Sequence, residues 1–113
     1  MNELRNKVNL IGRLGADPEV KKLDDGTVVA NFSVGINENY KDKAGEWQEK
    51  TSWHRIVAWG KTGELVEKLL VKGTEVILEG SLQNQSWEDK EGVKQYRTEV
   101  KLSEFLVLNN KKE

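Results

Sequence analysis

The sequence predicts an all-β domain with one short helix, closed into a small barrel, and three features of the chain support that prediction. Apolar and polar residues alternate over several runs, as they do in half-buried strands. A single segment, 61–73, has apolar residues at helical spacing instead. With 113 residues, the chain is long enough for one buried core and too short for two.

The first two strands are expected at 8–14 and 27–37. Alternation in 8–14 gives one mostly apolar face, and Gly15-Ala-Asp-Pro18 ends the run because proline cannot continue a central strand. Residues 19–23 are expected to form a short extended arm before the turn signal Asp24-Asp-Gly26. The alternation over 27–37 is uninterrupted, and its predicted core face carries Val28, Ala30, Phe32, Val34 and Ile36.

The third strand is expected at 51–59, after a polar hairpin loop at 38–50 that holds Tyr40 and Trp47. Alternation divides this strand into two faces. One face carries Thr51, Trp53, Arg55, Val57 and Trp59, and the other carries Ser52, His54, Ile56 and Ala58. The pattern leaves two alternatives open: the two Trp side chains fill the core, or they lie on an exposed surface opposite it.

Residues 61–73 predict a helix of about ten residues that plugs one end of the sheet. Thr62 can cap its start, and Gly73 suits its end. The apolar residues at helical spacing are Leu65, Val66, Leu69 and Leu70.

The last two strands are expected at 75–87 and 96–102, joined by a turn at 88–92. The apolar face of the first carries Val76, Leu78, Gly80 and Leu82. Tyr96 is expected to join the core from the second strand, and 105–108 is expected to close it, with Phe105 inside.

The order of three strands, one helix and two strands is typical of the OB-fold, a five-stranded Greek-key barrel. Residues 1–108 are therefore expected to form one OB-fold domain. Residues 109–113 are expected to be a short polar C-terminal end.

Composition restricts the classes of protein that the chain can belong to. It has 18 Lys and Arg against 19 Asp and Glu, a net charge of −1, so it lacks the basic excess common in nucleic-acid binders, although a local basic groove would suffice. With no Cys and one His, neither a metal nor another cofactor is expected. An apolar run of about 20 residues and a signal-peptide core are both missing from the sequence, so an intracellular protein without membrane contact is expected.

Five aromatic residues fall in loops or on the more polar strand faces: Tyr40, Trp47, Trp53, Trp59 and Trp87. Exposed rings along a groove allow unpaired bases to stack, at ~1–3 kcal/mol per base and with little sequence preference. Neighbouring cations would then contact the phosphates. The candidates are Lys7, Arg13, Lys41, Lys43, Arg55, Lys61 and Lys72.

Four ordered motifs resemble the bacterial single-stranded-DNA-binding proteins, the SSB family. They are Asn6-Lys-Val-Asn-Leu-Ile-Gly-Arg-Leu-Gly-Ala-Asp-Pro-Glu19, Gly26-Thr-Val-Val-Ala-Asn31, Thr51-Ser-Trp-His-Arg55 and Val71-Lys-Gly73. The resemblance covers residues 6–102. It implies an OB-fold that assembles as a homotetramer and binds single-stranded DNA without sequence preference during replication, recombination and repair. Such a protein would be cytoplasmic and associated with the nucleoid.

Carried over residue by residue, the resemblance assigns base stacking to Tyr40, Trp53, Trp59 and Trp87. It places His54 at a subunit contact and gives no role to Trp47, which remains a possible extra platform. The family commonly has Trp where Tyr40 stands and Phe where Trp59 stands.

Two departures from the family concern charge and partners. Residues 83–86 are Gln-Asn-Gln-Ser, where family members often have Arg or Lys before the last Trp, so fewer phosphate contacts are expected from this arm. Family members end in a linker and an acidic tip that recruits other proteins. This sequence stops at Lys111-Lys-Glu113, so that partner site is not expected in it.

Two other functions fit the sequence less well than DNA binding. An enzyme would need paired carboxylates or an activated nucleophile, whereas the acidic pairs Asp24-Asp25 and Glu88-Asp89 lie in turn-like sequence. An OB-fold used for protein contacts, or a primosome-type relative that binds DNA weakly as a dimer, would not need four aromatic residues kept together. No catalytic residue is therefore expected.

Overall fold

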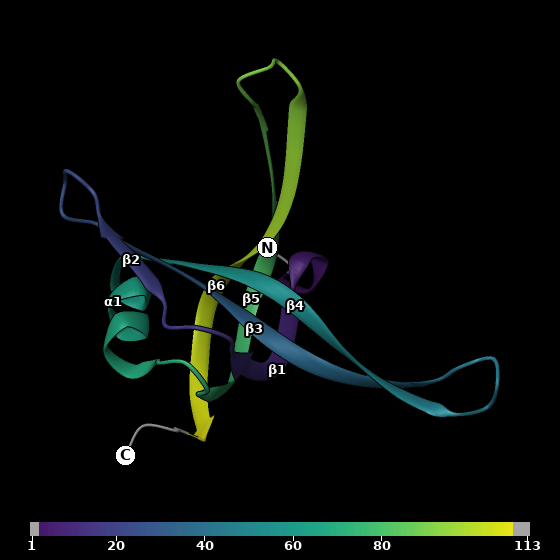
Figure 1. Ribbon diagram of the computed structural model, residues 1–113. Coiled ribbons are helices and arrows are strands. Elements are labelled where there is room, and N and C mark those ends of the chain that lie inside the picture. Colours follow the sequence, from purple (N-terminus) through teal and green to yellow (C-terminus); the bar gives the residue numbers. More distant parts are fainter. Residues whose placement is uncertain (1–2, 110–113) are drawn as a thin grey trace.

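The computed structural model describes residues 3–109, which form six strands and one α-helix after a short 3-10 helix (Figure 1). The elements are η1 (Glu3–Asn6), β1 (Val8–Leu14), β2 (Glu19–Lys22), β3 (Val28–Lys41), β4 (Trp47–Trp59), α1 (Gly60–Leu69), β5 (Glu75–Glu88) and β6 (Lys94–Asn109). The predicted all-β class with one α-helix is confirmed. With ten residues, α1 is far too short to cross a bilayer, and no helix within residues 3–109 is long and apolar enough to do so.

The strands close into a ring in the order β1-β5-β6-β4-β3, with β3 pairing back to β1. Strand β1 makes this closure, because Val8 to Arg13 pair with β5 while Arg13 and Leu14 also pair with β3. After the bend at Gly15, β2 continues along the same edge of β3. The pairing of β4 with β6 is parallel and the other pairings are antiparallel. This closed ring with its helix between β4 and β5 confirms the predicted OB-fold.

Gly12 permits the close approach at which the ring closes. A Cβ atom on this residue would lie 2.7 Å from the carbonyl oxygen of Gly35 on β3. Any larger residue would therefore separate β1 from β3. Backbone packing therefore requires glycine at this position of the apolar face of β1.

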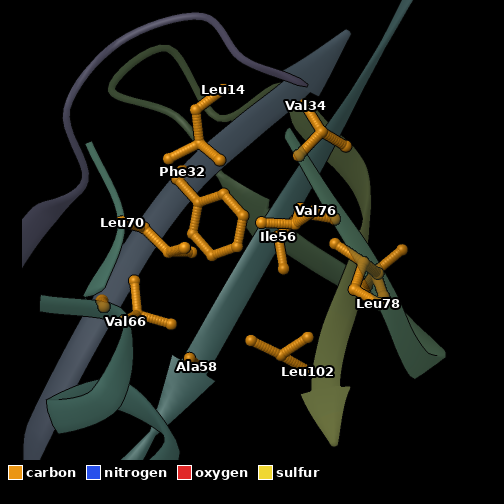
Figure 2. Packing of buried hydrophobic residues seen from close by; sticks show 12 residues of the cluster. Leu14, Phe32, Val34, Ile56, Ala58, Val66, Leu70, Val76, Leu78 and Leu102 are labelled. Carbon is orange, nitrogen blue, oxygen red and sulfur yellow. The ribbon is translucent and has the colours of Figure 1, made fainter. Parts of the chain in front are cut away.

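The inner faces of the strands and one side of α1 enclose a single apolar cluster, shown in Figure 2. It contains Leu14, Ala30, Phe32, Val34, Ile56, Ala58, Val66, Leu70, Val76, Leu78, Val100 and Leu102. The core face predicted for 27–37 is buried from Val28 to Val34, and Ile36 is half-buried where the strand leaves the ring. Ile56 and Ala58 are fully buried, so the face of β4 that carries them is the core face.

Several residues expected in the core are exposed instead. Tyr96 is 73% exposed because it lies on a hairpin beyond the ring, and Leu82 is exposed where that hairpin leaves the ring. Leu106, Val107 and Leu108 are exposed on the far end of β6, and of 105–108 only Phe105 packs against the core. Leu65 and Leu69 lie on the outer side of α1, which buries Val66 and Leu70.

The helix begins earlier than expected. Trp59 occupies the N-cap position in extended conformation, Gly60 takes a φ of 61°, and Thr62 already lies in the first turn, so the prediction of Thr62 as the cap is wrong. The helix ends at Leu69. Gly73 has a φ of 87° in the turn that leads into β5, four residues later.

Two hairpin arms project from the ring (Figure 1). Strands β3 and β4 remain paired out to Lys41 and Trp47, so the predicted loop at 38–50 is mostly strand. We refer to residues 37–51 as the first arm. Strands β5 and β6 likewise remain paired out to Glu88 and Lys94, and residues 83–99 are the second arm.

The two arms end in loops of the same design, Asp42-Lys-Ala-Gly-Glu46 and Asp89-Lys-Glu-Gly-Val93. In each loop, one aspartate oxygen accepts from the backbone N–H groups two and four residues later, at 2.9 Å. The other oxygen accepts from the glutamine six residues later, Gln48 or Gln95. These hydrogen bonds, chiefly those from the Glu46 and Val93 amides, hold the pKa of both aspartates below its usual value.

Candidate nucleic-acid interface

The outer face of β4 carries three Trp side chains at equal spacing. Trp47, Trp53 and Trp59 are each six residues apart, so they share one face of the strand, at intervals of about 20 Å along it. Trp47 is 71%, Trp53 59% and Trp59 46% exposed. The alternative that Trp53 and Trp59 fill the core is therefore wrong.

Trp53 lies against two glycines. Gly35 pairs with Trp53 across the β3–β4 ladder, and Gly15 follows β1. A Cβ atom on either glycine would come within 2.8 Å of the indole ring. The ring therefore lies on bare backbone, which fixes its position while leaving most of its surface in solvent.

A groove of about 390 Å³ runs beside Trp53, across β1, β3 and β4. Gly35, Asn37, Thr51 and Arg13 are among its lining residues. Arg13 points its guanidinium to the carbonyl oxygen of Gly73 at 3.0 Å and pairs with Glu75 at 3.7 Å. The structure thus brings Arg13, one of the predicted phosphate contacts, next to an exposed indole.

The second arm carries Trp87, which is half-exposed beside Arg97. The Cζ atom of Arg97 lies 5.2 Å from the centroid of the Trp87 ring, a cation–π distance. Arg97 also lies 3.5 Å from the carboxylate of Glu99, which pairs with Arg55 of β4 at 2.9 Å. Arg97 and Glu99 were not among the site residues inferred from the sequence. Arg97 lies opposite Gln85 in the pairing of β5 with β6. The sequence could have indicated this position only if the register of the two strands in the arm had been known.

The first arm has aromatic rings on both faces. Lys41 pairs with Trp47 on the face that carries Trp53, and its Nζ lies 5.8 Å from the Trp47 ring centroid. Tyr40 pairs with Gln48 on the opposite face, and it is also exposed. Register therefore assigns Trp47, rather than Tyr40, to the strand face shared by Trp53 and Trp59.

The remaining predicted cations are spread over the surface. Lys43 lies in the tip loop of the first arm, and Lys61 lies in the first turn of α1, two residues after Trp59. The backbone N–H of Lys72 donates to Asp17 at 2.8 Å. Lys7 pairs with Glu79 of β5 at 3.4 Å, away from β4.

A second exposed surface lies on the outer face of β1, β5 and β6. Ile11 pairs with Ile77, and Ile77 pairs with Leu106, so the three side chains form an apolar stripe across the strands. Ile11 and Leu106 are exposed and Ile77 is half-buried.

His54 lies on the core side of β4, half-buried, with its Nε2 3.3 Å from the hydroxyl of Ser52. Within residues 3–109, the search for three or more clustered His, Cys, Asp or Glu side chains that could hold a metal finds none.

A closed OB ring with exposed indoles and guanidinium groups on one outer surface is typical of domains that bind single-stranded nucleic acid. Comparison with known proteins gives the same class. The model of the single-strand binding protein family matches residues 5–108, and the chain belongs to this family.

Individual relatives support the assignment over most of the chain. The chain is 47% identical over 107 residues to Single-stranded DNA-binding protein 1 of Chlorobaculum tepidum, covering 94% of this chain and 66% of that protein. It is 43% identical over 109 residues to Single-stranded DNA-binding protein 1 of Xylella fastidiosa, covering 96% and 80%. Among solved structures, a Plasmodium falciparum SSB in complex with ssDNA superimposes with a TM-score of 0.85 at 38% identity, over 96% of this chain and 100% of that one.

Proposed function

We propose that the chain binds single-stranded DNA without sequence preference, by stacking bases on exposed rings and contacting phosphates with neighbouring cations. The observation that carries the proposal is the exposure of Trp53 and Trp59 on one face of β4, opposite an apolar core that they do not enter. Every base has a π face, so stacking does not depend on base identity. The proposed stacking residues are Tyr40, Trp53, Trp59 and Trp87.

The cations divide by their distance from these rings. Lys41 lies over the Trp47 ring, Arg13 lines the groove beside Trp53, and Arg55 is two residues from Trp53 on the same face of β4. We propose these three as the principal phosphate contacts. Lys43, Lys61, Lys72 and Lys7 are proposed as outer contacts along the path of the strand.

Intrinsic Trp fluorescence tests the proposal directly. Because three or more indoles would lie under bases, titration with oligo(dT) should quench much of the emission. Duplex DNA of the same length keeps its bases paired and should leave the emission nearly unchanged. Equal quenching by both, or by neither, would contradict stacking on unpaired bases.

We also propose that the chain assembles as a homotetramer. The stripe of Ile11, Ile77 and Leu106 supports self-association, because exposed apolar patches on small domains often mark interfaces between proteins. We propose that His54 lies at a subunit contact, as the resemblance to the SSB family implies, and its half-buried position supports that role.

The proposed role requires binding alone and no catalytic step. By coating single strands, the protein would protect them during replication, recombination and repair. Its place of action would be the nucleoid, in the cytoplasm.

A further inference from the structure

The second arm carries a positively charged side chain, Arg97, on its return strand β6, where the sequence pattern did not indicate a phosphate contact. Residues 83–86 of β5 are uncharged, Gln-Asn-Gln-Ser. Register, however, pairs Gln85 with Arg97 and Trp87 with Gln95, so Arg97 lies on the same face of the arm as Trp87. The return strand thus carries the positive charge missing from the outgoing strand.

Three contacts orient the Arg97 side chain. Its guanidinium stacks over Trp87 at 5.2 Å, its Nη2 donates to the Oε1 of Gln85 at 3.3 Å, and its Nε lies 3.5 Å from the Oε2 of Glu99. A long side chain held by a ring, an amide and a carboxylate loses most of its freedom before any ligand arrives. Pre-ordering of this kind reduces the entropy lost on binding.

Glu99 anchors a second arginine through the same oxygen. Its side chain is 3% exposed, and its Oε2 accepts from the Nε of Arg55 at 2.9 Å. Two guanidinium groups share one carboxylate, which leaves an excess of positive charge. Both arginines use Nε for this contact, and the Nη2 of Arg97 donates to Gln85. Their side chains are 45% and 40% exposed, so each guanidinium still presents N–H surface to solvent.

The cluster of Arg55, Glu99 and Arg97 lies between two of the proposed stacking rings. Arg55 is two residues from Trp53 on the same face of β4, and Arg97 contacts Trp87 on the second arm. A strand that stacks on both rings must carry its phosphates past this cluster. Guanidinium groups match phosphate geometry with paired N–H donors.

We propose that Arg97 is a phosphate-contacting residue of the single-strand site and that Glu99 is a positioning residue. Glu99 fixes Arg97 and Arg55 so that the backbone of the strand passes from the ring onto the second arm. Arg97 covers one face of the Trp87 indole, and the base stacks on the other. This inference rests on the proposed function.

The first experiment is a salt titration of oligo(dT) binding with Arg97→Met, which removes the charge but keeps an unbranched apolar stem that can still pack against Trp87. Loss of one phosphate contact should make the slope of log K against log salt shallower by up to about 0.7 per subunit. Binding should be several-fold weaker at low salt and approach the wild-type affinity as salt rises. The matched control is Lys94→Met, which removes one positive charge from the opposite face of the same arm, where Lys94 pairs with Glu88.

The outcomes separate the inference from the proposed function. If Arg97→Met weakens binding with an unchanged slope, Arg97 only packs against Trp87 and the inference is wrong. If both variants change the slope equally, the effect is general charge rather than a contact, and the inference is again wrong. If the wild-type protein does not bind oligo(dT), the proposed function itself fails.

Glu99→Gln tests the positioning role, because a charge effect and a positioning effect predict opposite changes in the affinity for oligo(dT). Removing a negative charge near DNA should strengthen binding if charge alone matters. If Glu99 positions the arginines, binding should weaken several-fold although the local charge becomes more positive. Tighter binding would overturn the positioning role.

Arg97→Lys provides a second measurement in case Glu99→Gln does not fold. Lysine keeps the charge, but its point-like ammonium cannot reproduce the planar fork that contacts Glu99 and Trp87 together. We expect weaker binding with the wild-type salt slope largely retained. Wild-type affinity in this variant would show that the geometry of the arginine is not used.

Discussion

Trp53 lies in an unusual position for so large an apolar side chain, exposed on a sheet and supported by glycine backbone. We predict that Trp53→Ala weakens oligo(dT) binding by ~1–3 kcal/mol per site while the midpoint of thermal unfolding stays close to the wild-type value. Little apolar contact with the core is lost, because the indole lies outside it. Binding isotherms and circular dichroism measure the two quantities. An unfolded variant would show that the indole is structural.

Gly35→Ala should disturb the same ring without deleting it. The new Cβ atom would lie 2.8 Å from the indole, and the ring, being exposed, can move away. We therefore expect a folded protein with altered Trp emission and weaker oligo(dT) binding. Ser33→Ala, on the same strand face two residues away, is the control and should change neither. Unchanged binding in Gly35→Ala would mean that the position of the ring does not matter.

The arms raise the question of which aromatic residue of the first hairpin stacks. Register puts Trp47 on the face of Trp53 and Tyr40 on the other face. If the bound strand follows a single face of β4, Trp47→Ala should reduce affinity by ~1–3 kcal/mol and Tyr40→Ala by much less. The reverse order would mean that the strand crosses to the opposite face of the arm, as the resemblance to the family implies. Competition binding with oligo(dT) of increasing length distinguishes the two.

The tip loops should respond to acid. Because hydrogen bonds to the carboxylates of Asp42 and Asp89 lower their pKa, the ionised form stabilises each loop. That contribution is present above the usual aspartate value of 3.8 and is lost as pH falls through the lower pKa of the folded loop. The NMR shifts of the Ala44 and Val93 amide protons, which donate to these carboxylates, should therefore move only in strongly acidic solution.

Asp42→Asn gives the corresponding control. It retains a hydrogen-bond acceptor but cannot titrate, so the Ala44 amide shift should become independent of acid while that of Val93 still moves. If both amides titrate in this variant, the carboxylate of Asp42 is not the group responsible.

Sequence patterns predicted the ring better than the arms, for a physical reason. Alternation identifies strands because one face is buried, and it correctly separated Ile56 and Ala58 from Trp53 and Trp59. On the arms neither face meets the core, so the polar residues of 38–50 looked like a loop. The same logic placed Tyr96 in the core, since alternation alone does not show where the ring ends. Arg97 was missed because its place opposite Gln85, on the same face of the arm as Trp87, follows only from the register that the tip loop sets.

The arms also enlarge the molecule as a whole. The radius of gyration is 16.2 Å, whereas a compact domain of this length would have about 13 Å. The largest extent is 55 Å. A chain with a net charge of −1 can therefore still present cations locally, because its acidic residues are spread over a wide surface or, like Glu99, are buried beneath arginines.

At the scale of the assembly, we predict a light-scattering mass about four times that of the 12.9 kDa chain. Leu106→Glu should dissociate this assembly and leave the monomer folded, because Leu106 is exposed on the apolar stripe. Leu23→Glu places the same charge at an exposed apolar position outside the stripe and should not. His54→Ala should weaken the assembly before it weakens the fold. A monodisperse wild-type monomer at micromolar concentration would end the proposal.

Because the two strands of the first arm are paired, insertions can lengthen this arm only in certain steps without moving Trp47 to its other face. Inserting one residue into each strand near the base would turn Trp47 to the other side of the hairpin. Inserting two into each would restore its side and carry the indole about 7 Å farther from the ring. The core would be untouched, because it ends before the arm begins. Reach can therefore be adjusted only in steps of residue pairs, and an odd insertion would redirect the platform.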